Sequence, residues 1–155
     1  MAAPTDIVVL LIALLDANWT PGNTGSITPE VGSGWFEPGG GPNQVVVAGV
    51  PDESARGSSG IAGIRPGGGN VQQMAGVCLV ECFSEERDDA IDNPEKLAHL
   101  FMREVQRIIM ANVNSVAGYD YVSFLGANRR PPSEDERPFL YGQSCRIGFG
   151  WRLEL

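Results

Sequence analysis

The hydrophobic positions in the second half of the chain follow two different periods. Residues 71–83 carry apolar side chains on both faces of an extended segment, which predicts a central strand covered on two sides. Residues 94–113 place apolar side chains at helical spacing, after an Asn93 N-cap and with Pro94 at the first helical position. Residues 139–155 alternate apolar and polar positions to the last residue. The pattern therefore predicts a sheet that ends in a long strand, with an amphipathic helix packed on it.

The first half of the chain contains fewer regular segments. Residues 6–18 predict a helix whose middle, IVVLLIALL, is apolar all round, so more than one side of it must be covered. Its own sheet covers one side, and either a neighbouring subunit or, for a central core helix, the rest of the core covers the other. Residues 44–50 are β-branched and lie between two prolines, which predicts a strand, and residues 119–125 predict another.

These elements predict one domain over residues 1–155, of the α+β class. We expect an antiparallel sheet of about four strands, with the long amphipathic helix packed on one face and the apolar N-terminal helix nearby. Glycine-rich segments at about 20–43 and 51–70 predict loops, with short extended pieces inside the first, and residues 126–138 predict a charged connector.

The closing strand is long for a domain of this size. Its 17 residues would span ~55 Å when extended, whereas a chain of this length folds into a body on the order of 40 Å across. We therefore expect the strand to bulge at Gly148 and Gly150 or to extend beyond the body. An overhanging strand with one apolar face needs another chain to cover it, so Phe149, Trp151 and Leu153 are candidate subunit contacts.

The charge of the chain argues against nucleic-acid binding. The formal net charge is −8, and binding to phosphates requires clustered lysine and arginine. Arg129 and Arg130 form a small basic patch, but Glu134, Asp135 and Glu136 follow and cancel it. We interpret this segment as an exposed connector or as a loop that holds a neighbouring subunit.

Trp35 and Phe36 lie inside the first glycine-rich segment. Aromatic residues in a loop either anchor a small satellite core or act as hot spots in a protein interface. Both alternatives stay open for this pair.

The cysteines and the apolar N-terminal run bear on the compartment. Cys78 and Cys82 lie four residues apart in a predicted strand, ~13 Å between α-carbons, whereas a disulfide needs about 4.4–6.8 Å. With Cys145 they are interpreted as small apolar residues in a reducing compartment. The run at residues 7–15 is too short to span a bilayer and lacks the preceding positive charge of a signal peptide. We expect a soluble cytoplasmic product with no membrane partner.

Residue chemistry indicates neither a catalytic residue, nor a metal site, nor a cofactor. The glycine-rich loops lack the lysine of a P-loop, and no serine stands in a G-x-S-x-G elbow. His99 is the single histidine and falls on the polar face of the predicted second helix. The acidic segment around Glu85 and Asp92 lacks the ligand spacing of a calcium loop. We therefore predict an assembly protein rather than an enzyme.

The order of these elements resembles that of tail terminator and tail completion (neck) proteins of tailed bacteriophages and archaeal tailed viruses. The resemblance rests on the apolar N-terminal helix, and on VCLVECFSEERDD leading into NPEKLAHLFMREVQRII. It continues through the connector RRPPSEDERP to the closing strand CRIGFGWRLEL. It covers the element order of most of the chain, but none of these segments is a signature motif, and the glycine-rich stretches lie outside it.

The resemblance implies a virion structural protein, assembled in the host cytoplasm. Subunits of this family form a homo-oligomeric ring, expected here to be a hexamer, at the head-proximal end of the tail tube. Such a ring contacts the tail tube protein and the head–tail connector proteins. Genomic DNA passes through its lumen without sequence-specific binding, and an acidic wall suits that passage.

Two other classes of function stay open at this point. One is a head-closure or connector adaptor of the same neck, which differs from a tail terminator only in its binding partner. The other is a non-viral binding module or small enzyme on an α+β scaffold, which would need a concave pocket with convergent polar groups. A nucleic-acid regulator would show steeply salt-dependent DNA binding, which the negative net charge disfavours.

Overall fold

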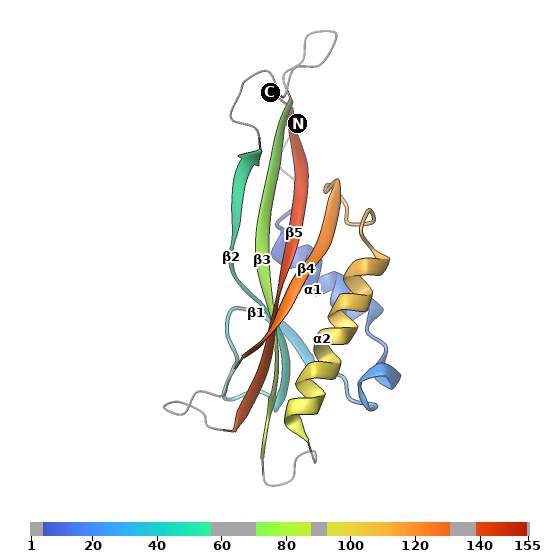
Figure 1. Ribbon diagram of the computed structural model, residues 1–155, viewed down its shortest axis with the longest axis vertical. Coiled ribbons are helices and arrows are strands. Elements are labelled where there is room, and N and C mark those ends of the chain that lie inside the picture. Colours follow the sequence, from blue (N-terminus) through green and yellow to red (C-terminus); the bar gives the residue numbers. More distant parts are fainter. Residues whose placement is uncertain (1–4, 57–70, 88–92, 131–138, 155) are drawn as a thin grey trace.

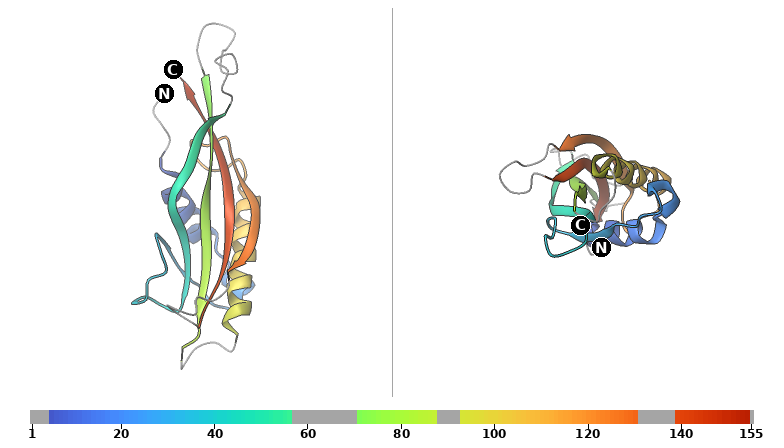
Figure 2. Two further views of the ribbon diagram at one scale, coloured as in Figure 1. Left: turned by 60° about the vertical axis from the view of Figure 1, so that its left-hand side comes forward. Right: turned by 90° about the horizontal axis from the view of Figure 1, so that it is seen from below.

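The computed structural model describes residues 5–56, 71–87, 93–130 and 139–154. Within these ranges the chain is an α+β protein with one mixed sheet and two α-helices that lie on the same side of it (Figures 1 and 2). The elements are α1 (Ile7–Asn18), the 3-10 turn η1 (Pro21–Thr24), β1 (Glu30–Ser33), β2 (Asn43–Arg56), β3 (Val71–Glu85), α2 (Pro94–Ala111), β4 (Tyr121–Arg130) and β5 (Leu140–Glu154).

The sheet has five strands in the order β1-β2-β3-β5-β4. All neighbours are antiparallel except β1 and β2, which run parallel. The expected α+β class is confirmed, but the prediction of about four antiparallel strands is incomplete. It missed β1, because four residues that include a glycine carry too little periodicity to predict a strand.

The prediction that residues 71–83 form a central strand is confirmed. β3 is paired with β2 on one edge and with β5 on the other. Val80 and Cys82 are fully buried beneath the helices, and Phe83 on the opposite face is only 3% exposed. A strand that is covered on both faces near one end accounts for the apolar residues at successive positions.

The closing strand neither overhangs nor bulges. β5 is 15 residues long, about 50 Å if extended, and pairs with β3 without a break from Val71↔Glu154 to Glu85↔Leu140. The irregularities lie instead in β2, between Ala48 and Asp52, and in β4, between Phe124 and Gly126. The expectation was wrong because β3 is equally long, which makes the protomer elongated along its strands (Figure 1).

Two segments predicted as loops are partly strand. β2 continues to Arg56, although the strand was expected to end at residue 50, and β4 takes up the first five residues of the expected connector. The remainder of the loop at 51–70 and of the connector at 126–138 lies outside the described residues.

Helix α2 packs across the middle of the sheet, mainly on β3 and β5. The Asn93 side chain accepts a hydrogen bond from the Lys96 backbone N–H at 3.0 Å and caps the first turn. The apolar stripe predicted from the sequence is buried against the strands, as expected for an amphipathic helix: its members are Leu97, Phe101, Val105, Ile108 and Ile109.

Helix α1 packs beside α2, over β1 and β2. Asp6 caps it by accepting a hydrogen bond from the Val8 backbone N–H at 2.9 Å. Ile7, Leu11 and Leu15 are buried, whereas Val9 on the opposite side is 56% exposed. Among the described residues, α1 is thus covered on one side only, although it is apolar all round.

Candidate subunit interface

The apolar face of β5 predicted subunit contacts at Phe149, Trp151 and Leu153, and the structure places the first two in the core of the protomer itself. Phe149 is 1% exposed and Trp151 is 7% exposed, and both belong to the main hydrophobic cluster under the helices. Phe149 also packs edge-to-face on Tyr119, with ring centroids 5.7 Å apart. Their burial removes both from the candidate surface. Leu153 pairs through its backbone with Gln72.

The predicted basic and acidic contacts are only partly described. Arg129 is exposed on β4 and forms an ion pair with Glu95 of α2. Arg130 pairs through its backbone with Gly142 of β5. Glu134, Asp135 and Glu136 lie outside the described residues. The structure therefore ties Arg129 to the first turn of the protomer's own helix α2.

The two aromatic residues of the first loop differ in their surroundings: Phe36 packs on the sheet, and Trp35 is exposed. Phe36 packs edge-to-face on Phe83 of β3, with ring centroids 5.6 Å apart, so it anchors the loop on the sheet. Trp35 is 77% exposed, the largest exposed fraction among the large apolar residues of the described chain. An exposed tryptophan next to a fixed anchor has the form of an interface hot spot.

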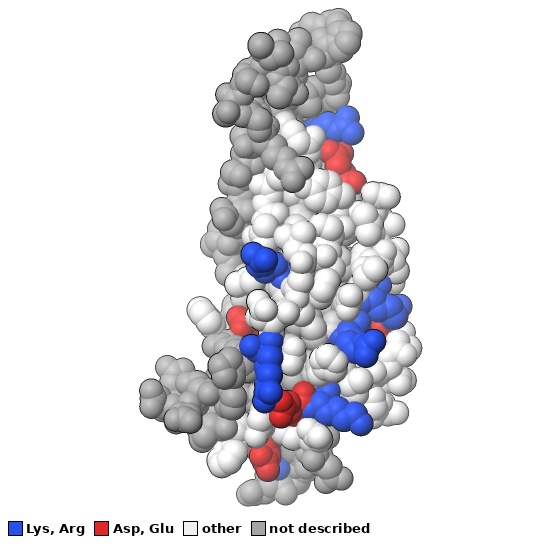
Figure 3. Space-filling view, in the orientation of Figure 1, with Lys and Arg blue, Asp and Glu red and all other residues white. Residues whose placement is uncertain are grey.

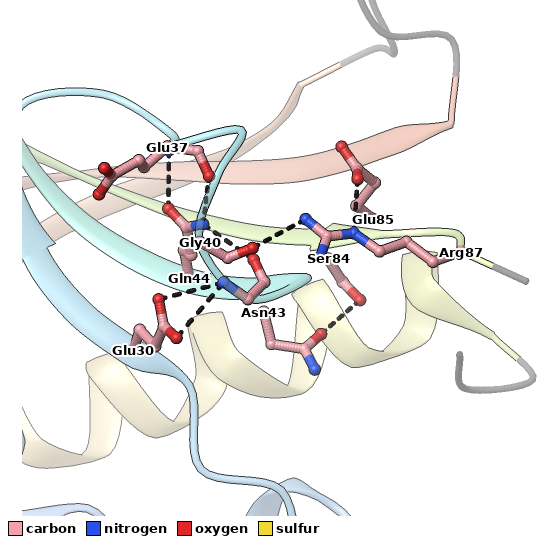
Figure 4. A network of polar contacts seen from close by, with 9 residues as sticks. Glu30, Glu37, Gly40, Asn43, Gln44, Ser84, Glu85 and Arg87 are labelled. Atoms are coloured by element: carbon pink, nitrogen blue, oxygen red, sulfur yellow. Dashed lines mark hydrogen bonds and ion pairs between the residues drawn. The ribbon is translucent and has the colours of Figure 1, made fainter. Parts of the chain in front are cut away.

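A network of polar contacts fixes the loop that carries Trp35 (Figure 4). The Gln44 side chain is 4% exposed and accepts a hydrogen bond from the Glu37 backbone N–H at 2.8 Å. Its amide nitrogen donates to the backbone carbonyls of Glu37 and Gly41, both at 2.8 Å. The Gly41 N–H in turn donates to both carboxylate oxygens of Glu30 at 3.3 Å. One buried amide side chain thus satisfies three backbone groups of the loop.

The same loop is tied to the end of β3. The Arg87 guanidinium donates to the Gly40 carbonyl at 3.0 Å and to the Glu85 carboxylate at 2.7 Å (Figure 4). The Ser84 hydroxyl donates to the Asn43 side chain at 2.8 Å. Because these contacts come from both ends of the loop and from β3, Trp35 is presented on a fixed support.

Replacing Gln44 by alanine is expected to release this loop. Three backbone groups lose their partner, and we expect a loss of about 1–3 kcal/mol in the free energy of unfolding. Hydrogen–deuterium exchange at residues 37–41 should accelerate, while exchange in α2 stays unchanged. The matched control is Gln106→Ala, since Gln106 is a half-exposed glutamine on α2. Equal exchange at residues 37–41 in both variants would contradict the role assigned to Gln44.

The side of the sheet that faces away from the helices carries few charged residues over β3, β5 and β4 (Figure 3). Alternation along the three strands places nine residues on this surface, which we name the open face. The members are Ala75, Val77, Leu79, Tyr121, Ser123, Leu125, Arg146, Gly148 and Gly150. An antiparallel sheet with one solvated face shows polar residues there, whereas this face is mostly small or apolar.

Two glycines make the open face smooth. A Cβ on Gly150 would lie 2.4 Å from the Tyr121 ring, and one on Gly148 would lie 3.2 Å from a methyl group of Leu125. The side chains of β4 therefore lie flat over β5. Leu79 and Leu125 are 42% and 50% exposed, so the face presents apolar surface without protruding side chains.

The open face could not be predicted from the sequence, because it depends on which strands lie side by side. Leu79 and Leu125 fall on the outward side of their strands once the pairing register is known. The glycines of β5 were interpreted as points of bending, whereas they are the places where β4 side chains cross. Only the alternation of β5, with small residues on its polar side, indicated a smooth surface.

An open hollow of about 520 Å³ lies along α2, and its lining includes the buried Glu104, which pairs with Arg107 through one carboxylate oxygen, while the other oxygen has no hydrogen-bond partner among the described residues. His99 is exposed on α2, as predicted. In the part of the chain that the structure describes, no group of three or more His, Cys, Asp or Glu residues is placed to hold a metal ion.

The three cysteines are free and buried in the core. Burial raises the pKa of the Cys78 thiol to about 12 and that of Cys145 to about 12, and it raises the pKa of Cys82 as well. Thiols with such pKa values carry almost no nucleophilic thiolate near neutral pH. They act as apolar core residues.

The described helices are too short or too polar for one of them to cross a membrane. No protein-family model matches the chain, and no curated protein matches it either. The fold and the surface define a small α+β protein with a buried core and with apolar surface on two sides that none of the described residues covers.

Proposed function

We propose that this chain is a virion structural protein that forms a ring at the head-proximal end of a viral tail tube. The ring terminates tail polymerisation and joins the tail to the head. It acts by shape and by surface contacts, without a catalytic residue and without a cofactor. Its partners are further copies of the same chain, the tail tube protein and the connector proteins of the head.

The observation that carries this proposal is a pair of apolar surfaces that the described part of the protomer leaves open. The outer side of α1, with Val9, points away from the sheet, and the open face points away from the helices. A monomer in water would expose Val9 on one surface and Leu79 and Leu125 on the other, and a neighbouring subunit that covers them would remove this apolar area from solvent. Assembly into a ring covers both.

Two further observations support the proposal. The elements on which the resemblance to tail terminators rests are present in the expected order: apolar α1, long β3, amphipathic α2 and closing β5. In addition, Trp35 is exposed on a loop that the Gln44 network fixes, which suits a contact with a second protein. The net charge of −8 suits a lumen through which DNA passes without adhering.

The test is a capping assay with the tail tube protein of the same virus. Purified tube protein is polymerised with and without the chain, and tube ends are examined by electron microscopy. We expect shorter tubes that carry ring-shaped density at one end. Trp35→Ala should weaken capping about thirtyfold or more, as the loss of a hot-spot residue does, whereas Met110→Ala, at an exposed position of α2, should not.

Unchanged tube length and bare tube ends would contradict the proposal. Binding to the portal or connector ring, but not to the tube, would replace it by the alternative of a head-closure adaptor. Equal loss of capping in the Trp35 and Met110 variants would remove Trp35 from the contact but would leave the ring in place.

A further inference from the structure

Helix α1 carries an outward stripe that ends in a negative charge. Val9, Ala13 and Asp16 are all exposed and follow the spacing of one helix face. No charged residue lies between Ile7 and Leu15, and no basic residue lies in the last turn. We name Val9, Ala13 and Asp16 the outer stripe of α1. The stripe is apolar along most of its length and acidic at its C-terminal end.

The open face has the complementary character. Its centre is small or apolar, and Arg146 is its single charged member. Arg146 pairs in register with Leu79 of β3 and Gly126 of β4, so it lies in the same row as the exposed apolar residues. Each protomer therefore has two different exposed surfaces. The open face combines an apolar centre with one arginine, and the outer stripe of α1 combines apolar residues with one aspartate.

The two surfaces also agree in length. Helix α1 has 12 residues, about 18 Å along its axis. Arg146 and Arg152 of β5 lie about 20 Å apart along the strand. Asp6 and Asp16 are both exposed at the two ends of α1, about 15 Å apart along the helix axis. Arg152 already forms an ion pair with Asp120 at 3.1 Å, so the charge match between the two surfaces rests on Asp16 and Arg146.

The contact surface allows close approach. Gly148 and Gly150 carry no side chain on the open face, and Tyr121 and Leu125 lie flat over them. Helices α1 and α2 already cover the other side of the same sheet. A helix laid on the open face would give β3 and β5 a second layer of the same kind.

We infer that α1 of one protomer docks on the open face of a second copy, with Asp16 beside Arg146. This contact is head-to-tail, because the two surfaces differ and lie on different sides of the protomer. A twofold dimer in which each α1 docks on the partner's open face would need both surfaces on one side of the protomer, whereas they lie on different sides (Figures 1 and 2). The head-to-tail contact covers both apolar surfaces at once, and its repetition generates a ring or a filament. The inference deepens the proposed function by naming the contact between subunits.

The test uses two variants that each block one surface. Ala13→Arg places a long cation in the middle of the outer stripe at an exposed helix position, and Leu79→Lys does so on the open face. Mass is measured by light scattering after gel filtration. The wild-type chain should exceed the mass of a monomer, and each variant should weaken association about thirtyfold or more, as the loss of a hot spot does. Met110→Lys, at another exposed apolar position, should leave the mass unchanged.

Mixing the two blocked chains decides the direction of the contact. Each retains the surface that the other has lost, so an equimolar mixture should form a complex of two chains and stop there. A second set of variants reverses the charges at the proposed contact. Asp16→Arg and Arg146→Asp should each weaken association, and a chain that carries both substitutions should recover it. Both residues are exposed, so the folded protomer should tolerate these changes, as circular dichroism can verify.

A wild-type chain that stays monomeric up to millimolar concentration would overturn this contact, and so would an assembly that neither blocking variant weakens. A mixture of blocked chains that stays monomeric would overturn the head-to-tail direction. A wild-type chain that stays monomeric in solution would also count against the proposed ring unless the chain assembles on tail tubes, which the capping assay tests separately. The other results leave the proposed function in place. If tubes are not capped while the blocked mixture forms pairs, the contact is correct and the role in the tail is wrong.

Discussion

Replacing Phe149 by alanine is expected to lower the free energy of unfolding by about 3–5 kcal/mol, the usual cost of emptying a buried phenylalanine site. The side chain is 1% exposed, and its ring packs on Tyr119. Urea denaturation, followed by circular dichroism, measures the change. The protein concentration should be varied, since association would make the midpoint depend on it.

Leu125→Ala is the matched control, because Leu125 is apolar but half exposed on the neighbouring strand. Its cost should stay below about 1 kcal/mol. The opposite pattern, with Phe149→Ala stable as a monomer but unable to associate, would restore β5 to the interface that the sequence analysis expected.

The three cysteine thiols are expected to react about a thousandfold more slowly in the folded protein than in urea. At pH 8 a thiol with a pKa of 9.0 is roughly one-tenth ionised, whereas one with a pKa of about 12 is ionised to roughly one part in ten thousand. Burial slows access further. A chromogenic disulfide reagent measures both rates at the same pH.

The same pKa shifts set the direction of the pH dependence. Between about pH 9 and pH 12 the unfolded chain releases thiol protons that the folded chain retains. The free energy of unfolding should therefore fall as the pH rises through this range, and full stability from the thiols is present below pH 9. A chain with all three cysteines replaced by alanine should lose part of this slope. If the thiol reagent labelled the folded chain as fast as the chain in urea, the buried positions of the three cysteines would be contradicted.

The parts of the fold that could be predicted are those with long, regular periodicity. The spacing of Leu97, Phe101 and Val105 predicted α2, and its N-cap at Asn93 was placed correctly. The apolar run on both faces of β3 predicted a central strand. In each case, many residues carry the same pattern, so local pattern and tertiary packing agree.

The missed features depend on pairing between distant segments. β1 is too short to show a period, and its parallel partner is known only from the register Glu30↔Gln44. The length of β5 predicted an overhang, but β3 is equally long and pairs with β5 along its whole length. Phe149 and Trp151 were assigned to an interface for a related reason. An apolar strand face does not indicate whether a helix of the same chain or a second chain covers it.

The candidate surface was the least predictable part. Trp35 was named, and its exposure agrees with an interface residue, but the network around Gln44 that fixes its loop involves residues from β2 and β3 as well. The open face required the register between β3, β5 and β4 before Leu79, Arg146 and Leu125 could be placed on one surface. A single sequence shows which side of a strand is apolar, but not which strands lie together.

The position of β5 has a consequence for how the chain is made. The strand that lies between β3 and β4 is the last of the five in the sequence, and Cys78 of β3 and its register partner Ile147 of β5 are 69 residues apart. During translation the ribosome therefore releases both neighbours before the strand that joins them. Closure of such non-local pairs is slow, and the waiting strand edges invite aggregation. A chaperone that binds nascent chains would therefore be most useful in the interval before β5 emerges, when the edges of β3 and β4 that pair with β5 are still exposed.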